Sequence, residues 1–195
     1  MTRQDEDIDA PATRAIFAPR SPIIFSRQMG RSQIAGIRQK LNQSRYDTLQ
    51  VISKIDDEAA HRRLRPDAWN IKDHVAHLMA MEEAIIHFAY RILAEDRPVS
   101  RLCFDESFDR DVWNNRKVDE RAGYTWIKTV CALEQTRTKL LDLLEQIPDN
   151  ALTRVGSHPV WGEPVTLASI LRIPYRHERG HRDEIDALRA RSARA

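Results

Sequence analysis

Two histidines four residues apart are the feature of this sequence that most directly suggests chemistry. His177 and His181 lie in a segment with helical periodicity. In a helix this spacing places both side chains on one face, with Cβ atoms about 5 to 6 Å apart, so both imidazoles can bind one metal ion. Two solvated polar residues on an outward face would show the same spacing. The pair alone therefore leaves both interpretations open.

A third ligand has to come from another helix, and His77 is the best candidate. It lies at the edge of the apolar stripe that contains Leu78, where a side chain would point toward the groove between helices. A core histidine with one hydrogen bond would occupy the same place. His74 lies nearer the centre of the stripe and is the rival ligand. We expect the other histidines on the surface or in loops, with the last a candidate for the rim of a site: His61, His87 and His158.

The segment from His177 to His181 also reads HExxH, the pattern of zinc proteases in which the glutamate is the general base. Its context argues against a protease. Glu184 and Ala187 stand where the longer protease motif has glycine and histidine, and we expect no strands that could align a peptide. Glu178 remains a candidate catalytic base or a partner of the ligands, and an exposed helix carboxylate is the alternative.

Four amphipathic helices are expected to position these residues. Apolar residues recur at intervals of three and four over about residues 31–56, 71–94, 122–147 and 167–191. A long ordered connection, about 96–120, joins the second helix to the third. The sequence predicts an all-α four-helix bundle over 29–195, preceded by a partly disordered N-terminal arm, 1–28.

Local signals mark where two of these helices begin. Asn70 and Asp73 have the spacing of a capping pair at the start of the second helix. Thr166 is a suitable N-cap for the fourth helix. Pro174 should kink that helix, because it removes the hydrogen bond to the carbonyl of Ile170.

Composition excludes several classes of protein. The chain has 195 residues, enough for one domain, and a formal net charge of +2, which gives no overall field to attract nucleic acid or an anionic membrane. No apolar run is long enough to cross a membrane, and the N-terminus lacks the apolar segment of a signal peptide. Cys103 and Cys131 have no metal-binding spacing and fit reduced thiols. We expect a cytoplasmic protein.

Several motifs together resemble one protein family. The segment from Trp69 to Leu78 is similar to the W-(S/N)-x6-H-(L/I) start of the second helix in the DinB-like (damage-inducible) superfamily. The run from Glu82 to Leu93 resembles the E-x5-F-A-Y-R-x-L motif of one subgroup, and His177 to His181 resembles its H-E-R-H-H motif. The similarity spans about 31–191.

This resemblance implies a four-helix bundle, often dimeric, in which three histidines hold a divalent metal such as zinc or nickel. Carried over by position, the ligands are His77, His177 and His181. Such relatives include S-transferases that use bacillithiol or mycothiol and a mycothiol-dependent maleylpyruvate isomerase. The resemblance therefore implies a metal-dependent enzyme, with a small-molecule substrate and in some cases a low-molecular-weight thiol as cosubstrate. The alternative is a metal-binding stress-response protein without turnover. We expect neither nucleic acid nor a membrane as partner.

Two charges fall on helix faces that should be buried. Glu82 lies between Leu78 and Ile85 on the second helix, and Arg137 lies on the apolar side of the third. An uncompensated buried charge is very unfavourable. We therefore predict that Glu82 and Arg137 form an ion pair across the bundle, with Arg91 as the rival partner of Glu82.

Overall fold

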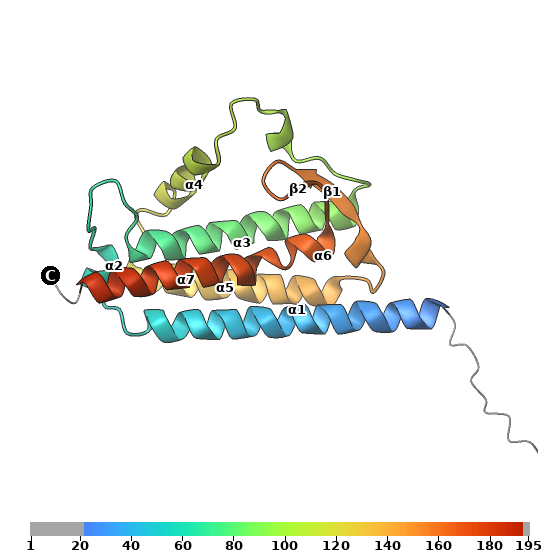
Figure 1. The fold of residues 1–195 in the computed structure, drawn as a ribbon, viewed down its shortest axis with the longest axis horizontal. Coiled ribbons are helices and arrows are strands. Elements are labelled where there is room, and N and C mark those ends of the chain that lie inside the picture. The colour runs from blue at the N-terminus through green and yellow to red at the C-terminus, as the bar shows by residue number, and fades with distance from the viewer. Residues whose placement is uncertain (1–21, 193–195) are drawn as a thin grey trace, which may run out of the picture.

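Four long helices lie side by side in the structure of the protein, a computed structural model that describes residues 22–192 (Figure 1). They are α1 (Pro22–Ile52), α3 (Ile71–Ala94), α5 (Trp126–Gln146) and α7 (Ile173–Ser192). The predicted four-helix bundle is confirmed. α1 begins inside the range expected to be an arm and ends four residues before the expected position, and residues 1–21 lie outside the described part of the chain.

The connection between the second and third long helices contains structure of its own. It includes a 3-10 helix (Arg101–Phe104) and α4 (Arg110–Asp119), and α4 packs against α3. Asp109 begins α4, since its side chain accepts hydrogen bonds from the backbone N–H groups of Asp111 and Val112. α4 is too short and too polar to show a clear apolar period in the sequence. A further one-turn helix, α2 (Asp57–His61), follows α1.

A β-hairpin stands where the sequence predicted only a loop. A short 3-10 helix (Ala151–Thr153) leads into β1 (Val155–His158), which pairs antiparallel with β2 (Gly162–Thr166). The expectation that strands are absent was wrong, because these strands of four and five residues are too short to show alternation. Gly156 lets the hairpin approach α3: a Cβ there would lie 2.9 Å from the ring of Phe88.

The predicted signals at the helix ends are confirmed. Asn70 and Asp73 form a complete capping box at the start of α3. Thr166 caps α6 (Leu167–Ile170), and a break separates α6 from α7, so the expected fourth helix is two helices. The break agrees with the effect predicted for Pro174, which lies in the first turn of α7, where a missing N–H costs little.

A layer of charge divides the apolar core into two clusters. One cluster includes Leu41, Leu140 and Ile170, and the other includes Ile52, Leu133 and Ile185. On α1, on α5 and on the α6–α7 segment, a charged residue lies between the residues that belong to the two clusters. The four buried charges of this layer, which we call the charge network, come one from each long helix: Arg45, Glu82, Arg137 and Glu178.

Every ion pair of the charge network joins different helices. Arg137 pairs with Glu82, and its Nη2 lies 2.8 Å from Glu178 Oε2. Arg45 Nε lies 2.6 Å from Glu178 Oε1, and its Nη2 lies 3.1 Å from Glu82 Oε1. The predicted pairing of Glu82 with Arg137 is confirmed. Arg91 pairs with Glu95 instead.

No helix among the described residues is long and apolar enough to cross a membrane.

Candidate metal centre

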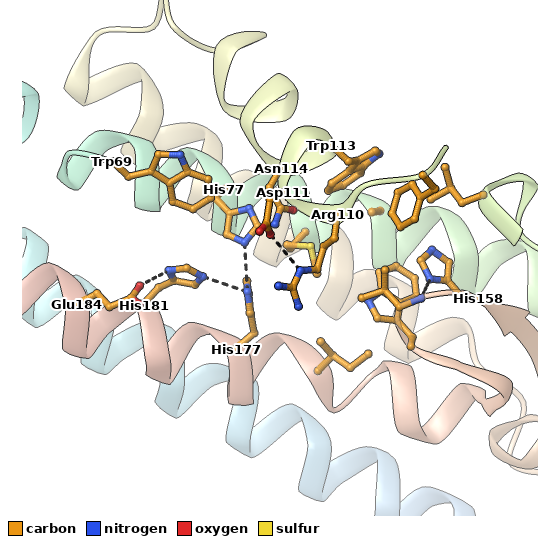
Figure 2. A pocket seen from close by; sticks show the side chains of 17 residues that line it. Trp69, His77, Arg110, Asp111, Trp113, Asn114, His158, His177, His181 and Glu184 are labelled. Carbon is orange, nitrogen blue, oxygen red and sulfur yellow. Dashed lines mark hydrogen bonds and ion pairs between the residues drawn. The ribbon is translucent and has the colours of Figure 1, made fainter. Parts of the chain in front are cut away.

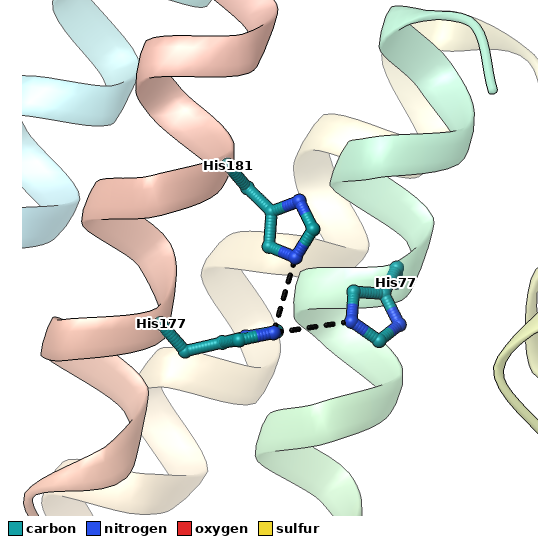
Figure 3. A group of neighbouring side chains, drawn as sticks. All are labelled: His77, His177 and His181. Carbon is teal, nitrogen blue, oxygen red and sulfur yellow. Dashed lines mark hydrogen bonds between the residues drawn. The ribbon is translucent and has the colours of Figure 1, made fainter. Parts of the chain in front are cut away.

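Three histidine side chains from two helices converge on one point beside the bundle core. His77 comes from α3, and His177 and His181 come from successive turns of α7 (Figure 3). The Nε2 atoms of His77 and His177 are 3.2 Å apart, and those of His177 and His181 are 3.1 Å apart. The structure thus brings together all three predicted ligands, which we call the histidine trio.

Burial keeps the histidine trio neutral. Desolvation, followed by the neighbouring histidines, lowers the pKa of His77 to about 2. Desolvation also lowers the pKa of His177 and His181 to about 4 each. At pH 7 all three are therefore neutral imidazoles, the form that donates a lone pair to a metal ion.

The geometry of the histidine trio fits a divalent metal. Zn–N bonds of about 2.0 to 2.1 Å in a tetrahedral site separate two ligand nitrogens by about 3.3 Å, close to the separations found here. A hydrogen bond between two imidazoles needs one donor and one acceptor, so three converging nitrogens are more fully satisfied by one cation than by one another. Nitrogen donors of this kind suit zinc, nickel and similar ions.

Glu184 orients one of the three ligands. Its Oε2 lies 2.8 Å from His181 Nδ1. A neutral His181 that donates its Nδ1 proton to this carboxylate presents the lone pair of Nε2 to the other two histidines. A carboxylate bonded to the outer nitrogen of a histidine is a common arrangement in zinc sites.

His74, the rival ligand, lies on the other side of His181. Its Nδ1 is 3.0 Å from His181 Nδ1 and 3.2 Å from Glu184 Oε2. His74, His181 and Glu184 thus form a second possible metal-binding group that shares one histidine with the trio. This group uses one exposed carboxylate, whereas the trio uses three largely buried imidazoles.

A cavity of about 500 Å³ opens at the histidine trio (Figure 2). Aromatic side chains dominate its apolar wall, and α4 and the hairpin turn supply much of the rest. A neighbouring cavity of about 690 Å³ lies toward Arg91 and Arg101. Residues from four parts of the chain line both cavities: Ala84, Leu102, Trp113, His158 and Trp161.

Sequence reasoning missed most of this wall. His158 was anticipated as a rim residue, and it does line the cavity. Trp69, Phe108, Arg110 and Trp113 were not assigned to the site. The available signal was the group of aromatic residues in the connection 96–120. Because this connection shows no apolar period, helix packing alone does not explain why it carries aromatic residues.

Glu178, the predicted general base, lies in the charge network. It is 1% exposed, and Arg45, Arg137 and Ser44 bond its two carboxylate oxygens. Burial by itself raises the pKa of Glu178, but the two arginines more than offset this, so the pKa lies below its usual value. It does not line the cavity, and a carboxylate held this way is not available to a substrate. We do not retain it as a catalytic residue.

The two cysteines are free thiols, as expected. Cys131 is exposed on α5, and Cys103 lies 3.1 Å from Glu163 of the hairpin. Neither lines the cavity beside the histidine trio.

These features define a class of protein: a bundle of long helices with a three-histidine site at the wall of a cavity. The chain belongs to the DinB superfamily, whose family model matches residues 40–185. None of the curated proteins matches the chain significantly.

Solved structures share the fold at low sequence identity. YfiT from Bacillus subtilis, described as a probable metal-dependent hydrolase with an unusual four-helix bundle topology, is 21% identical with a TM-score of 0.66, over 83% of this chain and 89% of YfiT. An uncharacterised protein from Escherichia coli UTI89 is 11% identical with a TM-score of 0.59, over 80% of this chain and 94% of that one. The colibactin self-resistance protein ClbS, solved in complex with a dsDNA, is 12% identical with a TM-score of 0.61, over 78% and 94%.

Proposed function

We propose that this protein is a metal-dependent enzyme in which His77, His177 and His181 hold one divalent ion. The observation that carries the proposal is the convergence of three neutral imidazoles at the wall of a cavity, with the Nε2 atom of His177 3.1 to 3.2 Å from those of the other two. A site buried among core side chains could hold a metal for stability alone. A site that opens on a cavity of about 500 Å³ gives a small-molecule substrate access to it.

Each part of the site then has a defined task. The two helices fix the histidine trio, and Glu184 holds the proton of His181 on Nδ1 so that Nε2 can bind. Aromatic side chains of the cavity wall bind the apolar part of a substrate and limit water near the reacting group. When bound through three protein ligands, a divalent ion supplies Lewis acidity and lowers the pKa of a water or thiol bound to it.

Two reaction classes fit this chemistry: hydrolysis, and transfer to a low-molecular-weight thiol. The description of YfiT supports the first, and the sequence resemblance to bacillithiol and mycothiol S-transferases supports the second. Addition of thiols to a Co²⁺-loaded sample separates them. A thiol that binds the metal shifts the visible spectrum and favours transfer, whereas a spectrum that responds to azide but not to thiols favours hydrolysis.

A metal-binding stress-response protein without turnover is the second candidate function. It predicts a closed set of four protein ligands, for which Glu184 and His74 are the nearest candidates. A Co²⁺ spectrum insensitive to both thiols and azide would support this candidate and argue against an enzyme.

The remaining proposals concern partners and location. We propose a homodimer in the cytoplasm, on the basis of the family resemblance and of cysteines that remain free thiols. Light scattering on a sizing column measures the mass in solution. ClbS was solved with dsDNA, whereas the net charge of +2 led us to expect no nucleic-acid partner here. Fluorescence anisotropy of a labelled DNA duplex at two salt concentrations tests that expectation.

Elemental analysis of the purified protein, before and after dialysis against zinc or nickel, tests the metal proposal. We expect about one ion per chain, as in other three-histidine catalytic sites. Metal content that does not change when all three histidines of the trio are replaced would end the proposal.

A further inference from the structure

His158 occupies a position between the two cavities that the proposed metal chemistry does not use. It is the last residue of β1, its side chain is only 7% exposed, and it lines both cavities. A largely buried polar ring packed against aromatic side chains needs partners for its two nitrogens.

The surroundings of His158 fix both its orientation and its tautomer. Trp161 stacks on the ring with centroids 3.8 Å apart and an interplanar angle of 12°, and the ring of Phe88 meets it edge-on at 5.3 Å. The backbone N–H of Val160 donates to His158 Nδ1 at 3.2 Å (Figure 2). Because Nδ1 is an acceptor, the proton of the neutral ring lies on Nε2. Burial lowers the pKa of His158 to about 4, although Glu163 partly opposes the shift, so the neutral form is present at pH 7.

The Nε2–H donor of His158 is left open. No described residue bonds to this nitrogen, and it is not among the sealed polar atoms without a partner, which in the described part of the chain are His77 Nδ1 and Glu82 Oε2. It therefore reaches accessible space. A donor fixed in direction beside aromatic side chains selects a ligand that carries an acceptor at the matching place.

We infer that His158 is a ligand-binding residue whose Nε2–H donates a hydrogen bond to the carboxylate of an aromatic substrate lying along Trp113 and Trp161. The two tryptophans supply apolar surface in both cavities. Arg101 lines the second cavity and forms no ion pair with any described carboxylate, so it favours an anionic oxygen there, whereas Arg110 in the first cavity is paired with Asp111. The inference deepens the proposed function by naming a substrate class for the same cavity, and it relies on that function only for the reaction.

Equilibrium dialysis with three related probes tests this inference. The probes are 2-naphthoate, 2-acetylnaphthalene and naphthalene, which share the aromatic part and differ in the acceptor. We expect the wild-type protein to bind them in that order of affinity. His158→Phe keeps a stacked ring without the donor, and should weaken 2-naphthoate about 3- to 10-fold, the loss expected for one hydrogen bond, while changing naphthalene less than about twofold.

Two further variants control the experiment. His61→Phe replaces an exposed histidine that lines neither cavity and should leave all affinities unchanged. His158→Gln retains an N–H donor and should recover part of the preference for 2-naphthoate, and it also serves if His158→Phe does not fold. Equal weakening of all three probes, an unchanged preference for 2-naphthoate, or no binding of any probe at millimolar concentration would overturn the inference.

Zinc content measured on the same samples separates this inference from the proposed function. His158→Phe should retain zinc. If zinc never binds but His158 still controls the preference for 2-naphthoate, the metal proposal fails and the binding role remains. If zinc binds but the protein shows no preference for 2-naphthoate, the metal proposal stands and the binding role of His158 fails.

Discussion

The histidine trio and the charge network share two helices, α3 and α7, and yet differ in almost every physical respect. α3 carries His77 and Glu82, and α7 carries the neighbouring residues His177 and Glu178. Consecutive helix residues point about 100° apart, so His177 faces the cavity while Glu178 faces the bundle axis. His77 and Glu82, five residues apart on α3, point about 140° apart and are divided in the same way. The helices thus present an open site and a closed one at the same level of the fold.

The contacts of the two groups explain the different roles. Each charged side chain of the network pairs with both of the opposite charges in it, and the four formal charges cancel. The histidine trio is uncharged, and its Nε2 atoms converge on one another rather than on a carboxylate. The trio therefore has lone pairs available for a ligand, whereas the charged groups of the network are engaged with one another. The following predictions test this division.

The largest expected effect comes from breaking the charge network. Replacing Glu82 by Gln or Arg137 by Met should lower the free energy of unfolding by about 3 to 5 kcal/mol, because each change leaves an opposite charge buried without compensation. Replacing both by neutral residues of similar volume, Glu82→Gln with Arg137→Met, should cost much less than the sum of the two single changes, since Arg45 and Glu178 still compensate each other. Denaturant unfolding of the four proteins of this double-mutant cycle provides the measurement.

Additive effects in that cycle would refute the pairing. Loss of metal in the Glu82→Gln protein, measured on the folded fraction, would show that the charge network and the histidine trio do not act separately.

The second expected effect is the pH dependence of the metal-free protein. His177 has a pKa of about 4 in the folded state against 6.5 ordinarily, so the unfolded state binds more protons as the pH falls from 6.5. The stability of the folded state should therefore decrease between pH 6.5 and 4, by up to about 3 kcal/mol for this residue at about 1.4 kcal/mol per pKa unit. Urea unfolding in the presence of EDTA measures it.

The variant His177→Ala should show a shallower decline over the same range. An identical slope in both proteins would mean that His177 is not the group that titrates.

A smaller effect should follow from loosening the orientation of one ligand. Glu184→Gln retains the size of the side chain but weakens its hold on the His181 Nδ1 proton, and we expect a 10- to 100-fold loss of zinc affinity. Asp183→Asn, one residue earlier on α7 and outside both possible metal-binding groups, is the matched control. Competition with a chromophoric chelator gives the affinities. Equal affinity of Glu184→Gln and wild type would remove Glu184 from the site.

The smallest effect is expected for His74, and it decides between the two possible metal-binding groups. If the trio binds the metal, His74→Gln should change zinc affinity less than about threefold, since only a neighbour of a ligand is lost. His77→Gln, the matched change one turn later on α3, should abolish stoichiometric binding. The opposite result would move the site to His74, His181 and Glu184.

The sequence was sufficient to predict the bundle because its long helices carry their own signals. The apolar stripe of α3 and the capping pair Asn70 and Asp73 are local features, and so is the break near Pro174. The pairing of Glu82 with Arg137 also followed from pattern, since a charge on a buried face requires a partner.

The cavity wall and the role of Glu178 could not be predicted in the same way. α4 and the hairpin are held by contacts with distant parts of the chain, such as that of Gly156 with Phe88, and have little periodicity of their own. The position of Glu178 within HExxH suggested a base, but the rotation of α7 turns this residue toward Arg45 and Arg137. That rotation depends on tertiary packing, which a motif does not encode.

Metal content per chain, measured by elemental analysis after zinc loading and gel filtration, tests the central claim most directly. The account predicts about one zinc per chain in the wild type and in a control with two exposed histidines replaced, His61→Ala with His87→Ala, and almost none in His177→Ala with His181→Ala. Circular dichroism confirms that each protein is folded. A folded His177→Ala, His181→Ala protein that retains one zinc per chain, or a wild type that retains none, would contradict it.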